Sequence, residues 1–307
     1  MFVTKSPVLA AAAILLLSAS AQAADLGKKK EPAPPPAPAA PLFDWAVGGK
    51  AMSDYISRGV TQSNHQPAVT AYGELRFNVH ENFQLYAGGQ LWSVKLPTNP
   101  AVEADIFAGV RPTFGPFAFD FGAIWYAYLN NTRQYFIDGT GVTFLTPVPG
   151  GVPTTAKNPG WGEIYGKASY TWNDMVTVGA NVFYAPNWTN VGADATYVSG
   201  TLKVNLPNNF YVSGEFGRQF LGTSKAAYGP TKYVSYNTWN AGVGYTYKIA
   251  TLDLRYSGTD LTRAQCWINT SDPRGNPVGV VANGRSSWCG HRFVATLSVD
   301  ISGKDLK

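Results

Sequence analysis

Apolar and polar side chains alternate with a period of two residues over most of the chain beyond residue 43. Within 68–79, for example, Leu75 and Phe77 have one parity, whereas Glu74 and Arg76 have the other. Successive side chains of a β-strand point to opposite faces of the sheet, so this pattern predicts strands with one apolar and one charged face. Beyond the first 23 residues, no apolar stretch approaches the roughly 20 residues that a membrane-spanning helix needs.

The alternating segments, bounded by turn residues, give twelve candidate strands. They lie at 44–56, 68–79, 83–94, 102–113, 117–128, 161–172, 175–186, 195–206, 210–221, 236–247, 251–260 and 291–302. Short turns at 80–82, 114–116, 173–174, 207–209 and 248–250 are each followed by a long connection before the next short turn. This regular alternation is typical of membrane barrels and favours them over a soluble sandwich. We therefore predict an all-β fold, an antiparallel transmembrane β-barrel with short periplasmic turns, longer extracellular loops and both ends on the periplasmic side.

Aromatic residues gather near the ends of the predicted strands, where amphipathic rings suit the interface between lipid and water. One girdle, on the periplasmic side, would consist of Phe83, Phe117, Trp172, Phe210 and Tyr247. The outer girdle would consist of Trp125, Tyr128, Trp161, Tyr184, Trp188 and Trp239. The strand propensity of aromatic side chains is the alternative explanation for any single member.

Both ends of the chain carry segments that we do not expect in the barrel. Residues 1–23 combine Lys5, a short apolar core and a small-x-small site before Ala24, which together indicate a secretory signal peptide. Residues 24–43 are rich in Pro and Ala and favour an extended polyproline conformation, so we expect a periplasmic tether there. Contact with peptidoglycan or a periplasmic partner is the alternative to a plain spacer. The barrel would then occupy 44–302, followed by a tail at 303–307.

Composition indicates an oxidising compartment and gives no reason to expect a nucleic-acid partner. The formal charge of +5 falls to about +2 for the barrel, because Lys5, the tether and the tail each contribute one net positive charge, and this gives no reason to expect a nucleic acid. Cys266 and Cys289 are the two cysteines, and export to an oxidising compartment favours a disulfide between them. A metal pair or a catalytic thiol is the weaker alternative, because only His291 lies nearby as a ligand.

An enzyme built on a barrel would need a nucleophile and a base. The histidines, His65, His80 and His291, lie in no recognisable nucleophile motif and are better explained as surface or interface residues. Gly-rich nucleotide motifs in a strand-to-helix context are missing as well. The sequence therefore predicts no catalytic residue, no metal ligand and no cofactor.

Ionisable residues of inward parity form the candidate functional site. They carry both signs in similar number, as rings of charge that line a water-filled pore would. The predicted pore-lining residues are Lys50, Asp54, Arg58, Glu74, Arg76, Glu103, Asp105, Arg111, Asp120, Glu163, Lys167, Lys203, Glu215, Asp253, Arg255 and Arg292. A plugged lumen is the alternative, because about eight strands leave room only for side chains, about sixteen leave a channel, and twelve fall between.

Two long connections are candidates for narrowing the opening of the pore. Residues 129–160 contain an apolar stretch at 142–148, which predicts that this loop folds inward or packs on the rim. Residues 261–290 carry the proposed disulfide, whose alternative role is simple protection of an exposed loop against proteolysis.

The end of the first predicted strand has the sequence Ser53-Asp54-Tyr55-Ile56-Ser57-Arg58-Gly59-Val60-Thr61-Gln62-Ser63, followed by Gln66-Pro67-Ala68. This block resembles the opening signature of the TorF-type family of proteobacterial porins, in which Ser-x-Tyr-x-x-Arg-Gly and a following Gln-Ser precede the second strand. The resemblance continues more diffusely around Glu103 and Asp105 and in Glu163-Ile164-Tyr165. It implies an outer-membrane barrel that conducts small solutes, with no established substrate.

The tether, the disulfide in the last loop and the tail after Ile301 depart from the common pattern of that family. In the signature block, Asp54 and Arg58 have one inward parity, and we expect them to pair near the end of the first strand. Gly59 would allow a bulge or tight bend at the rim. A purely architectural role for this block is the alternative to a role in lining the pore.

These observations favour a passive porin for small hydrophilic solutes in the outer membrane of a Gram-negative bacterium. A structural or surface-interaction barrel with a closed lumen is the competing hypothesis, and a lipid-modifying enzyme that uses His291 is the third. The expected partners are outer-membrane lipids and small solutes, with peptidoglycan as an open alternative through the tether. The sequence discloses no oligomeric state.

Overall fold

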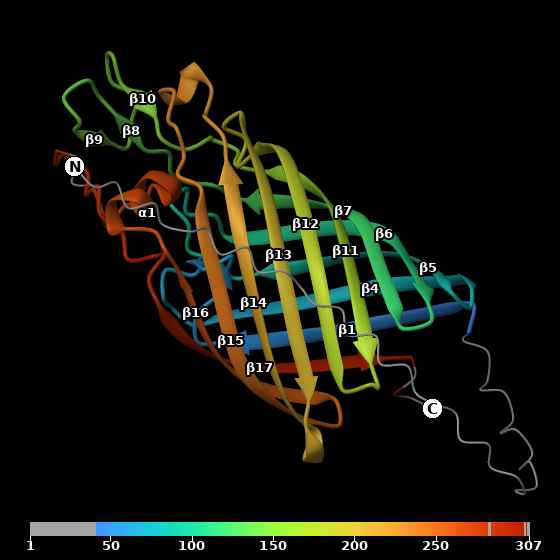
Figure 1. Ribbon diagram of the computed structural model, residues 1–307. Helices are drawn as coiled ribbons and strands as arrows, with labels where there is room; N and C mark the ends of the chain where they lie inside the picture. Colours follow the sequence, from blue (N-terminus) through green and yellow to red (C-terminus); the bar gives the residue numbers. More distant parts are fainter. Residues whose placement is uncertain (1–40, 282–283, 304, 306–307) are drawn as a thin grey trace, which may run out of the picture. The chain divides into compact units, whose positions relative to one another are not determined.

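The computed structural model describes residues 41–281, 284–303 and 305, which form a closed antiparallel barrel (Figure 1). Its wall follows the order β1-β17-β16-β15-β14-β13-β12-β11-β7-β6-β5-β4. The wall strands are β1 (Phe43–Met52), β4 (Ala68–His80), β5 (Phe83–Trp92), β6 (Val102–Phe114), β7 (Phe117–Leu129), β11 (Trp161–Trp172), β12 (Val176–Trp188), β13 (Ala193–Asn205), β14 (Phe210–Leu221), β15 (Tyr236–Tyr247), β16 (Ala250–Thr259) and β17 (Arg292–Ser302). The prediction of an all-β barrel with twelve antiparallel strands is confirmed. The predicted signal peptide and nearly all of the predicted tether lie outside the described residues.

Side chains of the wall alternate between an apolar outer face and a polar lumen. On β4, Leu75 is 58% exposed on the outside, whereas its neighbour Glu74 is 7% exposed. Phe293 on β17 and Ile106 on β6 are among the most exposed apolar side chains, at 83% and 70%. An apolar outer surface of this extent is what a lipid environment requires of a barrel.

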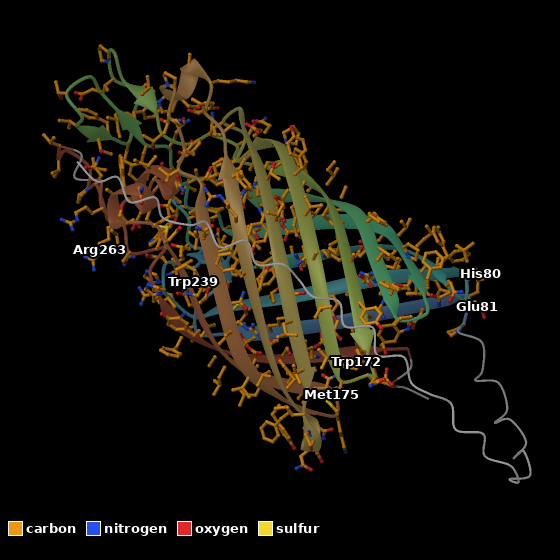
Figure 2. All side chains as sticks on the ribbon, viewed as in Figure 1. His80, Glu81, Trp172, Met175, Trp239 and Arg263 are labelled. Carbon is orange, nitrogen blue, oxygen red and sulfur yellow. A yellow bond between two sulfur atoms is a disulfide. The ribbon has the colours of Figure 1, made fainter. Side chains whose placement is uncertain are left out.

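Short turns close the hairpins at one end of the barrel, which we call the turn end. The turn between β11 and β12 has Asn173 and Asp174 at φ 49° and 54°, the left-handed pair that matches the twist of antiparallel strands. Figure 2 labels Glu81 and Met175 in two of these turns. Phe43 pairs with Phe77 near the same end, so β1 begins there.

Long connections gather at the opposite end, which we call the loop end (Figure 1). They contain a three-stranded sheet of β8 (Phe136–Ile137), β9 (Thr143–Phe144) and β10 (Val152–Pro153), the helix α1 (Arg263–Thr270) and the short helix η2 (Ala226–Tyr228). The other short helix, η1 (Pro207–Asn209), lies in the short turn between β13 and β14. The apolar stretch 142–148 contacts the long loop at 261–290, where the Thr143 amide donates a hydrogen bond to the Val280 carbonyl over 3.3 Å. No helix within the described ranges has both the length and the hydropathy needed to cross a membrane.

The first strand is shorter than predicted. β1 ends at Met52 rather than at residue 56, and the chain then leaves the wall. Residues 53–67, which we call the plug, contain the hairpin of β2 (Ile56–Ser57) and β3 (Val60–Thr61). The alternation of side chains in β1 continues beyond Met52, although the chain there has left the wall and folds back on itself. The alternation alone therefore did not show where the strand ends.

The buried apolar clusters lie at the loop end. One contains Val191, Ala193 and Tyr233, and a second contains Trp161 against Ala195. A third forms around Cys266, Trp288 and Cys289. Apolar packing among the described residues is therefore concentrated at this end, where the long connections meet.

Candidate functional site

The tip of the plug is a two-residue turn formed by Arg58 and Gly59. Both have positive φ, 46° and 78°, as a tight hairpin between antiparallel strands requires. The Tyr236 hydroxyl donates to the Arg58 carbonyl over 3.2 Å, and a Cβ atom at Gly59 would collide with Thr238 and Thr259. Gly59 therefore makes the turn of a hairpin that rests against β15 and β16, and does not bend the end of β1 as predicted.

The Arg58 side chain extends from this tip to strands on another part of the wall. Its two terminal nitrogens donate to the two carboxylate oxygens of Glu163 on β11, each over 2.8 Å. The guanidinium also lies 4.9 Å and 4.7 Å from the ring centres of Phe183 and Tyr197 on the intervening strands. The Arg58 side chain is 17% exposed and that of Glu163 is 1% exposed, so this ion pair occupies the interior of the barrel.

The predicted pair of Asp54 and Arg58 is wrong. Asp54 is buried at the base of the plug, where its carboxylate accepts hydrogen bonds from the hydroxyls of Thr61 and Ser63 over 2.5 Å and 2.9 Å. The second carboxylate oxygen lies 3.0 Å from His65 Nδ1. The hairpin folds back over Asp54 and supplies its partners locally, which leaves Arg58 free to reach Glu163.

The described residues of 261–290, which we call the lid, hold the plug from the loop end. The predicted disulfide between Cys266 on α1 and Cys289 is present, with the two Cα atoms 5.8 Å apart. The neighbouring Trp288 is 2% exposed, accepts from the Thr61 amide over 3.0 Å and donates from its indole nitrogen to Asn64 over 3.0 Å. The disulfide thus anchors the segment that fixes the plug.

A cavity of about 190 Å³, which we call the loop-end chamber, lies between the plug and the long connections. Its aromatic lining residues are Tyr55, Tyr126, Tyr128, Trp161, Trp188, Tyr233, Tyr236 and Trp288. Tyr128, Trp161 and Trp188 were expected in the outer lipid girdle, and that prediction is wrong, whereas Trp125 and Tyr184 are exposed on the outside. Inward parity is the signal that could have placed Tyr128 and Trp161 in the lumen.

A second cavity of about 520 Å³, which we call the turn-end chamber, lies on the other side of the Arg58 side chain. Ionisable side chains from opposite parts of the wall line it, including Lys167, Glu215 and Arg255. Arg58 and Tyr126 line both chambers. The guanidinium therefore stands at the junction of two cavities inside one barrel.

The structure brings most of the predicted pore-lining residues together in ion pairs. Arg111 donates twice to Glu74, each time over 2.8 Å, and Arg76 donates to the same carboxylate over 2.6 Å. Farther along the chain, Arg255 pairs with Asp253 over 2.9 Å. The Lys167 amine lies 3.6 Å from the Asp120 carboxylate. Such pairs cancel much of the lumen charge in each neighbourhood.

The remaining predicted residues differ in their access to water. Lys50 on β1 and Lys203 on β13 are exposed at inward-facing positions, and none of the ion pairs among the described residues includes them. The Lys203 amine lies 4.7 Å from the ring centre of Tyr211. Arg292 is partly buried on β17, opposite Ser257. The two lysines are therefore the lumen cations best placed to act on a passing ion.

Glu103 and Asp105 present the opposite situation on β6. Each is 2% exposed, and no ion pair of the described part of the chain includes either. The Tyr55 hydroxyl donates to Glu103 over 3.0 Å, and the Gln90 amide donates to Asp105 over 2.8 Å. These two carboxyl groups are buried with neutral partners, and Glu103 lines the loop-end chamber.

The histidines give one arrangement that sequence reasoning missed. His65 Nε2 lies 3.4 Å from the Ser287 hydroxyl, while Nδ1 lies against Asp54, so the three residues are hydrogen-bonded in series between plug and lid. His291 instead stacks on Tyr256, whose hydroxyl lies 2.8 Å from its Nδ1. Within the described residues, no group of three or more His, Cys, Asp and Glu side chains is placed to hold a metal ion.

Solved structures of outer-membrane proteins align with this chain at low similarity. The NanC porin is 10% identical with a TM-score of 0.43, and covers 83% of this chain and 98% of its own. OmpT, an outer membrane protein of Vibrio cholerae, is 9% identical with a TM-score of 0.38, and covers 84% and 96%. The toluene transporter TodX of Pseudomonas putida is 10% identical with a TM-score of 0.42, and covers 86% and 89%. At these values the likeness carries no argument about function.

No curated protein matches this sequence. A family match, in contrast, covers residues 38–276, which is most of the chain and includes the plug, part of the lid and most of the residues that line the two chambers. The description of this family gives no function and does not name the TorF-type porins, so that resemblance stays a prediction. The chain belongs to the Gcw_chp family, which is described as bacterial proteins of unknown function.

Proposed function

We propose that this chain is a channel of the Gram-negative outer membrane through which small hydrophilic solutes diffuse passively. The observation that carries the proposal is the pair of cavities inside the barrel, of about 190 Å³ and 520 Å³, with the Arg58 side chain at their junction. A barrel whose lumen served only as packing would need no second cavity lined by charged side chains. The plug then acts as the constriction of the channel.

The lining of the turn-end chamber supports a hydrophilic solute. Charged residues of both signs face it, and Lys50 and Lys203 are exposed at inward-facing positions of the wall. Charged side chains without an opposite charge nearby are stable where water reaches them, and rings of such charge tune ion preference in pores. The resemblance of the plug to the TorF-type signature supports the same function.

The orientation follows from the usual arrangement of such barrels, with short turns in the periplasm and long loops outside. In this orientation the lid and the plug lie toward the exterior. The first strand, β1, begins on the periplasmic side, so a tether at 24–43 would precede it there. We infer that this tether is a spacer, and a contact with peptidoglycan is its alternative role.

Single-channel recording in planar bilayers tests the proposal. The folded wild-type protein should give discrete conductance steps, and Arg58→Ala should increase the step size because it removes the side chain between the chambers. Arg218→Ala is the matched control, since Arg218 is exposed on β14 beside Phe220 and lines neither chamber. A folded barrel that is silent both as wild type and as Arg58→Ala would overturn the channel and favour the closed structural barrel.

A further inference from the structure

The loop-end chamber combines an aromatic lining with one unpaired acidic group. Among the residues that line it, the charged ones are Arg58 and Glu103. Arg58 is already neutralised by Glu163 through two hydrogen bonds of 2.8 Å. The remaining acidic group of the chamber is therefore the carboxyl group of Glu103.

Glu103 is unusually placed for a carboxylate without a cationic partner. It is 2% exposed, and the Tyr55 hydroxyl, 3.0 Å away, is a neutral donor. Asp105 has the same inward parity two residues along β6, is equally buried and is bonded by the neutral Gln90 amide. Burial of a carboxyl group in its charged form is costly unless a positive charge compensates it, and no ion pair of the described residues compensates either member of this pair. An incoming cation would supply that charge.

The walls of the chamber suit an organic cation better than a metal ion. The aromatic rings of Tyr126, Trp161, Trp188 and Tyr236 come from four different strands and line the same chamber as Glu103. Faces of Trp and Tyr rings attract quaternary and protonated amines, and rings arranged around a space form the usual cage for such groups. A metal ion would need several oxygen or nitrogen ligands, which aromatic walls do not provide.

Two buried polar atoms in the lining are also unsatisfied. The indole nitrogen of Trp161, a residue 8% exposed, and the hydroxyl of Thr155 have no hydrogen-bond partner among the described residues. Buried polar groups in folded proteins normally have partners, so a bound molecule with a polar group of its own would satisfy these atoms. The volume of about 190 Å³ exceeds the roughly 150 Å³ of an engineered cavity that holds benzene.

We propose that the loop-end chamber binds a small organic cation, a quaternary ammonium or protonated amine that also carries a hydroxyl or other hydrogen-bond acceptor. The ammonium group lies among the aromatic rings and compensates Glu103, and the polar group accepts from the Trp161 indole. Passage of this cation through the barrel rests on the proposed function of the chain as a channel. Its binding in the loop-end chamber does not.

Isothermal titration of the full-length, detergent-folded protein tests the binding directly. Choline is the probe, and 3,3-dimethyl-1-butanol is its control, because it has the same shape with carbon in place of the charged nitrogen. Choline should bind at least about tenfold more tightly than the neutral alcohol. Equal affinity for the two compounds, or no binding of either, would overturn the proposal without any variant being needed.

The Glu103→Gln variant tests the assigned partner of the cation. It should lower choline affinity by about tenfold or more and leave the affinity for the neutral alcohol unchanged. Glu81→Gln is the matched control, since it removes the same charge from an exposed turn at the other end of the barrel (Figure 2). Unchanged choline binding in folded Glu103→Gln would contradict the inference. A protein that binds choline but gives no conductance would instead overturn the proposed channel alone.

Discussion

Arg58 and Glu163 lie 105 residues apart in the chain and are joined inside the barrel by two hydrogen bonds of 2.8 Å each. One residue sits at the tip of the plug and the other on β11. Parallel bonds between a guanidinium and a carboxylate fix geometry as well as charge, and neither side chain is more than 17% exposed. This contact therefore determines where the plug stands in the lumen.

Removal of Glu163 should loosen the plug. Glu163→Ala leaves a largely buried guanidinium with fewer partners, at a local cost of about 1.5–3 kcal/mol for charged hydrogen bonds. Amide hydrogen exchange at 56–61 should become faster in the variant, and the added effect of Arg58→Ala should be much smaller than its effect in the wild type. Additive effects of the two substitutions would show that the pair is not coupled.

Ion preference should depend on the lumen lysines more than on the arginines. Lys50 and Lys203 are exposed and outside the described ion pairs, whereas Arg111 and Arg255 are each bonded to a carboxylate. Neutralising a paired arginine also frees its partner, so the change is partly structural. We expect Lys50→Gln with Lys203→Gln to shift the reversal potential in a salt gradient toward cations.

The matched comparison for the lysines is Lys248→Gln, which removes a positive charge from an exposed turn outside the lumen. It should leave the reversal potential close to that of the wild type. If the turn variant shifts the reversal potential as much as the lumen pair does, the two lumen lysines do not set the ion preference.

Reduction of the disulfide should release the lid. Cys266 and Cys289 are 23 positions apart, and closing a loop of that length contributes roughly 3 kcal/mol. Trypsin should cleave after Arg274 or Arg285, both exposed in the lid, faster when the protein is reduced or carries Cys266→Ser with Cys289→Ser. Equal cleavage rates in the oxidised and reduced protein would mean that other contacts hold the lid.

The wall of the barrel could be predicted because each of its strands is specified locally. Alternation between a lipid face and a polar lumen shows that Glu74 points inward and Leu75 outward without knowledge of any neighbour. Turn residues such as Asn173 and Asp174 mark the hairpins in the same local way. Strand count, antiparallel pairing and the inward position of most charged residues of the wall follow from these two signals.

The contents of the lumen could not be predicted, because they depend on contacts between distant residues. The alternation of side chains predicted that Arg58 faces inward. It could not show whether the partner of Arg58 is Asp54 or Glu163, because the partner depends on where the hairpin turns. Parity likewise could not tell an aromatic girdle from a lined chamber for Trp161, because both occur near a strand end. The helix α1 was missed although Thr262 and Gln265 form a capping box, which is a recognisable sequence signal.

Asp54, His65 and Ser287 are hydrogen-bonded in the order used by serine hydrolases, so the enzyme hypothesis has a definite test. We expect no ester hydrolysis, because the 3.4 Å between Ser287 Oγ and His65 Nε2 exceeds the roughly 2.6–3.2 Å typical of such pairs, and Ser287 lines neither chamber. Release of p-nitrophenol from p-nitrophenyl butyrate should be the same for wild type and Ser287→Ala. Hydrolysis by the wild type that disappears in both Ser287→Ala and His65→Ala would establish an active site between plug and lid. In that case Asp54, His65 and Ser287 would do more than hold the plug and the lid together.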